Sequence, residues 1–273
     1  MSFRLLPMAI RAVLQTADTH NAKIPKALRA DLENSLELIA NVATTSFAGQ
    51  SIADAVNDAV RNGEDPTESA DVQAAFIRDR VQELQSNGAL DNAARTNLHQ
   101  VTVDAVDGLF DAFKPIYDAA GAQLAAAHAT FVANGIPTMD DTQIANANLD
   151  VAQANVDARK AQATLRSILN ALDALEAALG KMGSGNGVGR AVATFDLGTT
   201  PASDLRRFLG AMTPWEALTE GYTISLANPT EQRARIARAN RADEDTNASF
   251  AQQQHDAMAT SWGKIPVESR PKV

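Results

Sequence analysis

The feature that most constrains this chain is a repeating apolar pattern in its middle. From Ile144 to Leu179, apolar residues recur at alternating spacings of three and four, and the charged residues fall between them. This heptad spacing is typical of a helix that packs along another helix. We call this stripe the heptad seam, and it predicts one helix of about 40 residues, roughly 60 Å long. Its members are Ile144, Ala147, Val151, Ala154, Ala158, Ala161, Leu165, Ile168, Leu172, Leu175 and Leu179.

A second apolar stripe precedes the heptad seam and is separated from it by a short turn. It runs from Leu109 to Phe131, and the sequence Asn-Gly-Ile-Pro at 134–137 then ends the helix. Asn and Gly favour the left-handed conformation at helix ends, and a short connection makes two helices antiparallel. We therefore expect a long helical hairpin. Its first helix should kink or break at Pro115, which lacks an amide hydrogen-bond donor.

The leucine-rich end of the heptad seam leaves two interpretations open. The favoured interpretation is an intramolecular hairpin core, and the alternative is an intermolecular coiled coil, because this end needs a large apolar partner surface. Trp215 and Trp262 are further candidates for a C-terminal core or an interface, because tryptophan is enriched in both. The complete set of candidate interface residues is Leu165, Ile168, Leu172, Leu175, Leu179, Trp215 and Trp262.

The rest of the chain organises around this hairpin. The sequence of residues 1–90 predicts a series of short helices, and we expect residues 91–181 to form the hairpin itself. Four glycines mark a flexible joint at 182–190, and residues 191–273 predict a small C-terminal region with a proline-containing tail. The predicted fold is mainly α: an extended, coiled-coil-like antiparallel hairpin with an N-terminal helical region and a small, mostly helical C-terminal region.

Short local signals refine the two outer regions. Ser51, followed by an acidic residue three positions later, predicts a helix start, because the hydroxyl can accept a bond from an early amide. Thr213 with Glu216 predicts a capping box, with proline at the first helical position. Residues 192–197 and 222–226 are short enough for edge strands and could pair as one β-hairpin.

Charge and composition narrow the kinds of site that this chain can form and the locations in which we expect it. The net charge is −9, but residues 1–180 carry 13 basic and 23 acidic side chains, whereas residues 181–241 carry 8 and 5. The chain has no cysteine, which excludes disulfides and thiolate metal sites. No apolar run reaches the roughly 20 residues of a membrane span, and no signal peptide is apparent. We expect a location in a virion or in the cytoplasm.

No pattern in the sequence predicts catalysis or a cofactor. The four histidines are scattered singly, without the spacing that places two imidazoles on one helical face for zinc. The glycine run at 183–189 fits neither a dinucleotide fingerprint nor a phosphate loop. Paired acids lie at helix starts or in polar stretches, where they favour the helix dipole or hydration. We therefore expect no enzyme activity, no cofactor and no bound metal.

Four arginines share a predicted helix at 231–241: Arg233, Arg235, Arg238 and Arg241. Guanidinium groups suit phosphate oxygens, so this helix is a candidate phosphate contact. The aromatic residues of an RNA-stacking surface are absent from it. A solvated face, or a contact with the acidic surface of a neighbouring subunit, is the favoured interpretation, and nucleic acid is the less favoured one.

Together these patterns indicate a non-enzymatic structural or assembly protein of a larger complex. An alanine-rich, acidic, cysteine-free helical chain suits a repeated component of a particle, and a bacteriophage virion or assembly component is the expected setting. Its expected partners are copies of itself or other subunits of the particle. The alternative function is a nucleic-acid-binding or regulatory adaptor that uses the arginine-rich helix at 231–241.

Overall fold

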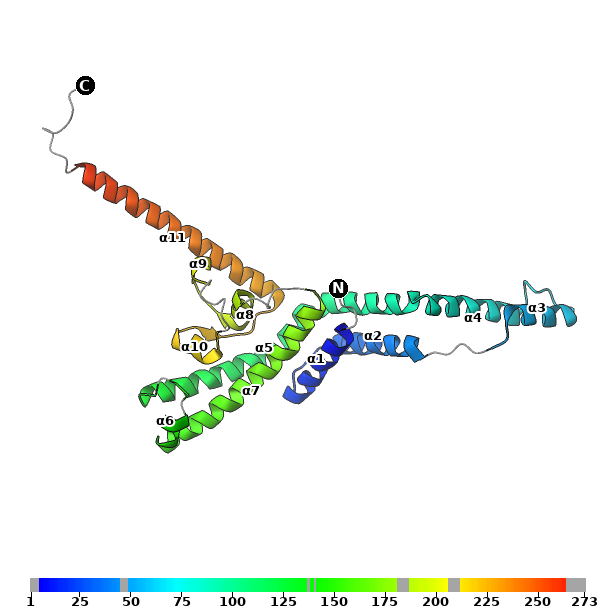
Figure 1. The fold of residues 1–273 in the computed structure, drawn as a ribbon, viewed down its shortest axis with the longest axis horizontal. Coiled ribbons are helices and arrows are strands. Elements are labelled where there is room, and N and C mark those ends of the chain that lie inside the picture. The colour runs from blue at the N-terminus through cyan, green and yellow to red at the C-terminus, as the bar shows by residue number, and fades with distance from the viewer. Residues whose placement is uncertain are drawn as a thin grey trace, which may run out of the picture.

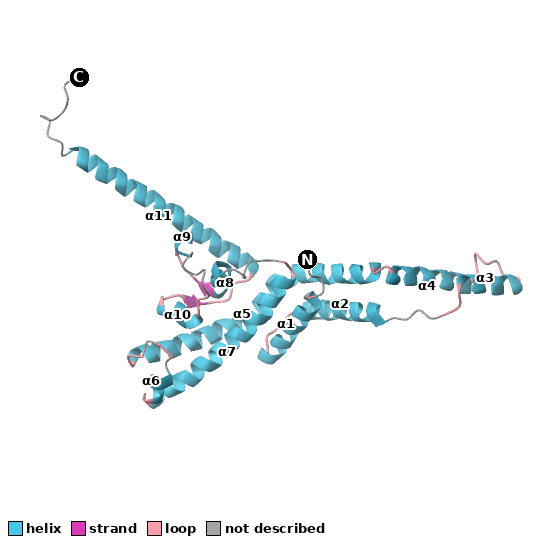
Figure 2. Cartoon of the chain, in the orientation of Figure 1, coloured by secondary structure: helices cyan, strands magenta, loops and turns pink. Residues whose placement is uncertain are grey.

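The computed structural model describes residues 5–44, 49–136, 138–139, 141–180, 187–205 and 212–263. The fold is mainly α, as predicted, with one antiparallel pair of very short strands (Figure 2). The elements are α1 (Leu6–His20), α2 (Lys26–Thr44), α3 (Ile52–Arg61), α4 (Ala70–Ser86), α5 (Ala89–Ala133), α6 (Asp141–Ala145), α7 (Leu149–Ala178), α8 (Gly187–Thr194), β1 (Phe195–Asp196), α9 (Ala202–Leu205), α10 (Pro214–Thr219), β2 (Thr223–Ile224) and α11 (Pro229–Gly263).

The predicted helical hairpin is formed by α5 and α7, which run side by side in opposite directions (Figure 1). Ala147, in the turn before α7, is half-buried, and every other member of the heptad seam is buried. Phe113, Leu124 and Phe131 of α5 are completely buried in the same core. The seam is therefore covered within this chain.

The second helix of the hairpin begins later than its sequence predicts. The seam predicts one helix through residues 144–179, whereas the structure has the short α6, an interruption at residues 146–148, and then α7. Asn148 explains the interruption, because its side-chain oxygen accepts a 3.0 Å bond from the amide of Val151 and caps α7. The expectation of one uninterrupted helix was wrong at this point.

Pro115 lies inside α5, and the helix continues through it for its full 45 residues. At 1.5 Å per residue, α5 is about 68 Å long. The sequence predicts a kink or a break here, and the structure shows no break, since α5 is one helix from Ala89 to Ala133. Figure 1 shows α5 bending between the part beside α2 and the part beside α7.

The two N-terminal helices cover the remaining apolar surface of the hairpin. α1 packs on the leucine-rich part of α7, where Ile10 and Val13 are completely buried and His20 Nε2 lies 3.1 Å from Ser167 Oγ. α2 packs on the first half of α5 through Leu32 and Leu36. We call α1, α2, α5 and α7 the body of the molecule.

Two helical projections leave this body in different directions (Figure 1). One is the α3–α4 arm, residues 51–86, in which α3 lies beside α4 and α4 leads into α5. The predicted cap at its start is confirmed, since Ser51 Oγ accepts a 3.1 Å bond from the amide of Asp54. The other projection is the distal part of α11.

The C-terminal region packs against the middle of α5. β1 and β2 pair antiparallel, with Phe195 opposite Ile224 and Asp196 opposite Thr223, so the predicted pairing is confirmed over two residues. It is short because residues 192–194 belong to α8. The capping box of Thr213 and Glu216 is also confirmed at the start of α10.

Two predicted features of this region fall partly or wholly outside the described residues. Of the glycine-rich joint at 182–190, residues 182–186 lie outside them, and residues 187–190 form the first turn of α8. The predicted proline-containing tail, residues 265–273, lies outside them entirely.

Candidate functional site

The candidate site is the attachment of α11 to the body, where a polar stripe on α5 holds the segment 224–231. Asp118 Oδ1 accepts a 2.9 Å bond from the amide of Leu226. Lys114 Nζ donates to the carbonyl oxygen of the same residue and to Glu231 Oε2 at 3.0 Å. Both backbone groups of buried Leu226 are thus satisfied by side chains of α5.

The stripe continues one and two turns earlier along α5. Asn228 Nδ2 donates to Asp111 Oδ1 at 2.9 Å, and Thr230 Oγ1 donates to Asp107 Oδ2 at 2.7 Å. Asn228 also caps α11, because its Oδ1 accepts a 2.8 Å bond from the amide of Glu231. The start of α11 is therefore fixed both in position and in direction.

Sequence reasoning missed this stripe. Its residues, Asp107, Asp111, Lys114 and Asp118, follow spacings of four, three and four on one face of α5. That spacing places side chains one above another on a helix, here on the face nearly opposite the apolar stripe that was recognised. The periodicity was a usable signal, but it does not indicate which segment binds there.

Gly121 extends the same face of α5 toward β2. A Cβ atom added there would lie 2.7 Å from Cγ2 and 3.0 Å from the carbonyl oxygen of Ile224. These distances are below normal van der Waals separation, so the close packing of β2 on α5 requires a residue without a side chain.

Arg235 joins the elements of the C-terminal region from within. Its Nη1 donates to the carbonyl oxygens of Val192 at 3.0 Å, Phe195 at 2.7 Å and Ser225 at 3.0 Å. Burial is the main cause that lowers the pKa of Arg235 from its usual value. A guanidinium has donors in several directions and can bind several carbonyls at once, so Arg235 holds α8, β1 and the β2–α11 connection together.

The other three predicted phosphate contacts lie on the surface of α11. Arg238 Nη2 lies 3.4 Å from Asp196 Oδ1. Arg233 and Arg241 are exposed and donate to backbone carbonyls four residues earlier in their own helix. The structure therefore does not bring the four arginines onto one open surface, because Arg235 is turned inward.

The predicted interface residues are placed in the core or outside the described side chains. Leu165, Ile168, Leu172, Leu175 and Leu179 are each at most 3% exposed, covered by α1 and α5. They are therefore unavailable to another subunit while the body is folded.

The two predicted tryptophans are placed differently. Trp215 is buried at the start of α10 and makes edge contacts with Phe131 at 5.2 Å and His128 at 4.8 Å between ring centroids. It thus anchors α10 on the far half of α5. Trp262 lies in the last turn of α11, and its side chain is outside the described part.

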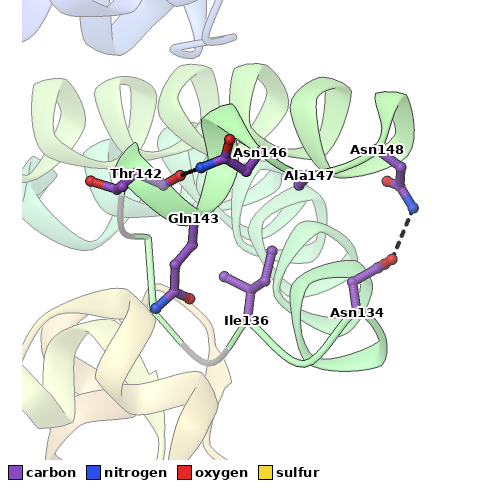
Figure 3. A pocket seen from close by; sticks show the side chains of 7 residues that line it. All are labelled: Asn134, Ile136, Thr142, Gln143, Asn146, Ala147 and Asn148. Carbon is purple, nitrogen blue, oxygen red and sulfur yellow. Dashed lines mark hydrogen bonds between the residues drawn. The ribbon is translucent and has the colours of Figure 1, made fainter.

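An open pocket lies at the tip of the hairpin, around α6 (Figure 3). Asn146 Nδ2 donates to the carbonyl of Thr142, and Asn148 Nδ2 donates to Asn134 Oδ1, both at 2.9 Å. The lining residues are Asn134, Ile136, Thr142, Gln143, Asn146, Ala147 and Asn148. All are uncharged, so this lining offers amides that close the turn and no group that titrates near neutral pH.

The described residues contain no group of three or more His, Cys, Asp or Glu side chains that could hold a metal ion. Within the same residues, no helix combines the length and the hydropathy needed to cross a bilayer. No protein-family model matches this chain, and no curated protein or solved structure is significantly similar to it.

Proposed function

We propose that this chain is a non-enzymatic structural or assembly protein of a larger complex, with a bacteriophage virion or its cytoplasmic assembly as the setting. One observation carries the proposal. The chain covers the apolar core of its own body, while the α3–α4 arm and the distal part of α11 extend away from that body (Figure 1). Long projecting helices provide surfaces for neighbouring subunits.

The α3–α4 arm has the properties of a contact surface. Val60, Phe76 and Ile77 are 62–63% exposed, and residues 51–86 carry eight acidic and three basic side chains. Exposed large apolar side chains with polar residues around them are typical of protein–protein contacts. The arm is therefore suited to binding partners that have apolar and basic surfaces.

Sedimentation velocity over a wide concentration range tests the proposal. We expect an elongated particle that associates as its concentration rises. The double variant Phe76→Asp/Ile77→Asp should weaken any association that uses the arm, because both changes place charge in an apolar contact. Gln82→Asp is the matched control, since it adds a charge to an exposed residue of the same helix. A compact monomer at every concentration would contradict the proposal.

The exposed arginines favour a second candidate, an adaptor that binds nucleic acid. Arg233 and Arg241 are exposed, and within the described part of the chain they donate to oxygens of their own helix. Nucleic-acid binding would therefore use these two residues rather than Arg235. Retention on DNA and RNA should then fall steeply with salt and be lost in Arg233→Ala/Arg241→Ala. Absence of binding at low salt would remove the candidate.

A further inference from the structure

The face of α11 that points away from the body has a regular pattern. Gln232, Arg235 and Ala239 face the body and are buried or half-buried. The opposite face, which we call the outer face of α11, follows heptad spacing, and all of its described members are exposed. These members are Ala234, Ala237, Arg241, Glu244, Ala248 and Ala251.

The helix α11 extends far beyond the part of it that contacts the rest of the chain. α11 contacts α8, α9 and α5 over its first half, as far as Asp243, whose Oδ1 accepts a 2.6 Å bond from Ser203 Oγ. Its distal part projects away from the body (Figure 1). Residues 244–249 and 251–253 are all exposed. Helices in proteins gain most of their stability from packing, so a second helix along this face would stabilise the projection.

The outer faces of two copies of α11 have complementary charges when the two helices are antiparallel. If two copies of α11 lie antiparallel about a point between Ala242 and Asp243, Arg241 of each copy lies opposite Glu244 of the other. Arg238 then lies close to Asp245 of the second copy, on the flank of the contact. A parallel pairing would instead place arginine beside arginine and glutamate beside glutamate, which is unfavourable.

The same register aligns the small residues. Ala237 lies opposite Ala248 of the second copy, and Ala234 lies opposite Ala251. Small side chains on both helices allow the two backbones to approach closely. The outer face points away from the body, so the two bodies would lie on opposite sides of the helix pair.

We infer that the outer face of α11 binds the same face of a second copy of this chain, as an antiparallel helix pair around a two-fold axis. A two-fold contact of this kind uses one patch on both subunits. The inference rests on the proposed function, since it names a copy of the chain as a partner. The Arg241–Glu244 layers set the orientation, and the alanine layers set the close packing.

Exchanging the charges of Arg241 and Glu244 tests whether these residues set the orientation of the helix pair. The dimer dissociation constant is measured by sedimentation equilibrium at low salt. Arg241→Glu alone and Glu244→Arg alone each bring like charges together twice at the two-fold axis, so each should raise the dimer dissociation constant about tenfold or more. The double variant Arg241→Glu/Glu244→Arg restores opposite charges and should return the constant to near that of the parent protein. Failure of the double variant to recover, with both single variants weakened, would overturn the pairing.

Cysteine cross-linking tests the register directly, because the chain has no cysteine of its own. A mixture of the single variants Ala237→Cys and Ala248→Cys should form a disulfide-linked dimer under mild oxidation. Neither variant should do so alone, because the two copies of residue 237 would be 11 residues, about 16 Å, apart along the axis. Cross-linking of Ala237→Cys with itself would indicate parallel helices and overturn the inference.

The two experiments separate this inference from the proposed function. A protein that associates with concentration, but whose association ignores both the charge exchange and the cysteine pair, contradicts the α11 contact and leaves the structural role supported through another surface. A protein that stays monomeric at every concentration contradicts both.

Discussion

Gly121 lies where α5 and β2 come closest, and it provides a test at the scale of one residue. Gly121→Ala should destabilise the protein by about 1–3 kcal/mol, because the new methyl group would overlap Ile224. Gly108→Ala on the same helix is the control, since its Cβ would make an ordinary 3.5 Å contact with Leu28. The control should be neutral or more stable by up to about 1 kcal/mol. Equal effects on chemical denaturation would contradict the close packing.

His128 makes the stability of the α10 contact depend on pH. Burial lowers the pKa of His128, so the folded state favours the neutral ring more than the unfolded state does. Its contribution to stability is therefore present above the unfolded pKa of about 6.5 and is lost as the pH falls through the lower folded value.

Denaturation at two pH values checks this effect. Between about pH 7.5 and pH 5, the free energy of unfolding should fall more for the parent protein than for His128→Gln, whose side chain does not titrate. The other ionisable groups are common to both proteins and cancel in the comparison. Parallel pH profiles would show that His128 is not desolvated by the contact with Trp215.

Arg235 is an example of a residue whose place in the structure the sequence does not predict. All four arginines of 231–241 have the same side chain and similar neighbours, so each was an equal candidate for phosphate binding. The structure distinguishes them because the carbonyls of Val192 and Phe195 come from elements some 40 residues earlier in the chain. Which arginine turns inward depends on that tertiary arrangement.

At the scale of elements, the heptad seam could be predicted because its period depends on neighbouring residues and repeats over many turns. Eleven positions with regular spacing identify a buried helical face whatever lies opposite it. The caps at Ser51 and Thr213 were readable for the same reason, since each involves residues three apart. The interruption before α7 was not, because Asn148 interrupts an apolar period that continues across it.

Leu172→Asp tests whether the seam is dry. A charge buried between α7 and its neighbours should cost about 3–5 kcal/mol and unfold the body under mild conditions. Ala163→Asp places the same side chain on an exposed position of α7 and should change stability by less than about 0.5 kcal/mol. Thermal unfolding followed by circular dichroism compares the two, and a tolerated Leu172→Asp would mean that the seam is hydrated.

At the scale of the whole molecule, α1 resolves the ambiguity left by the sequence. The leucine-rich end of the seam needed a partner, and no local pattern identifies α1 as that partner across some 150 residues of chain. Since α1 covers it, the seam is closed within one chain, and the contacts that we propose between copies use the projections. The mainly α class was thus predictable from periodicity, whereas the division into a closed body and open projections was not.

Hydrogen exchange measured at low and high protein concentration tests this division most directly. We predict that backbone amides at 165–179 are strongly protected, and equally so at both concentrations, because the seam is buried within one chain. Amides of the distal part of α11 and of the α3–α4 arm should gain protection as concentration rises. Protection of 165–179 that appears with association alone would show that the seam is covered by another copy, and would contradict the account.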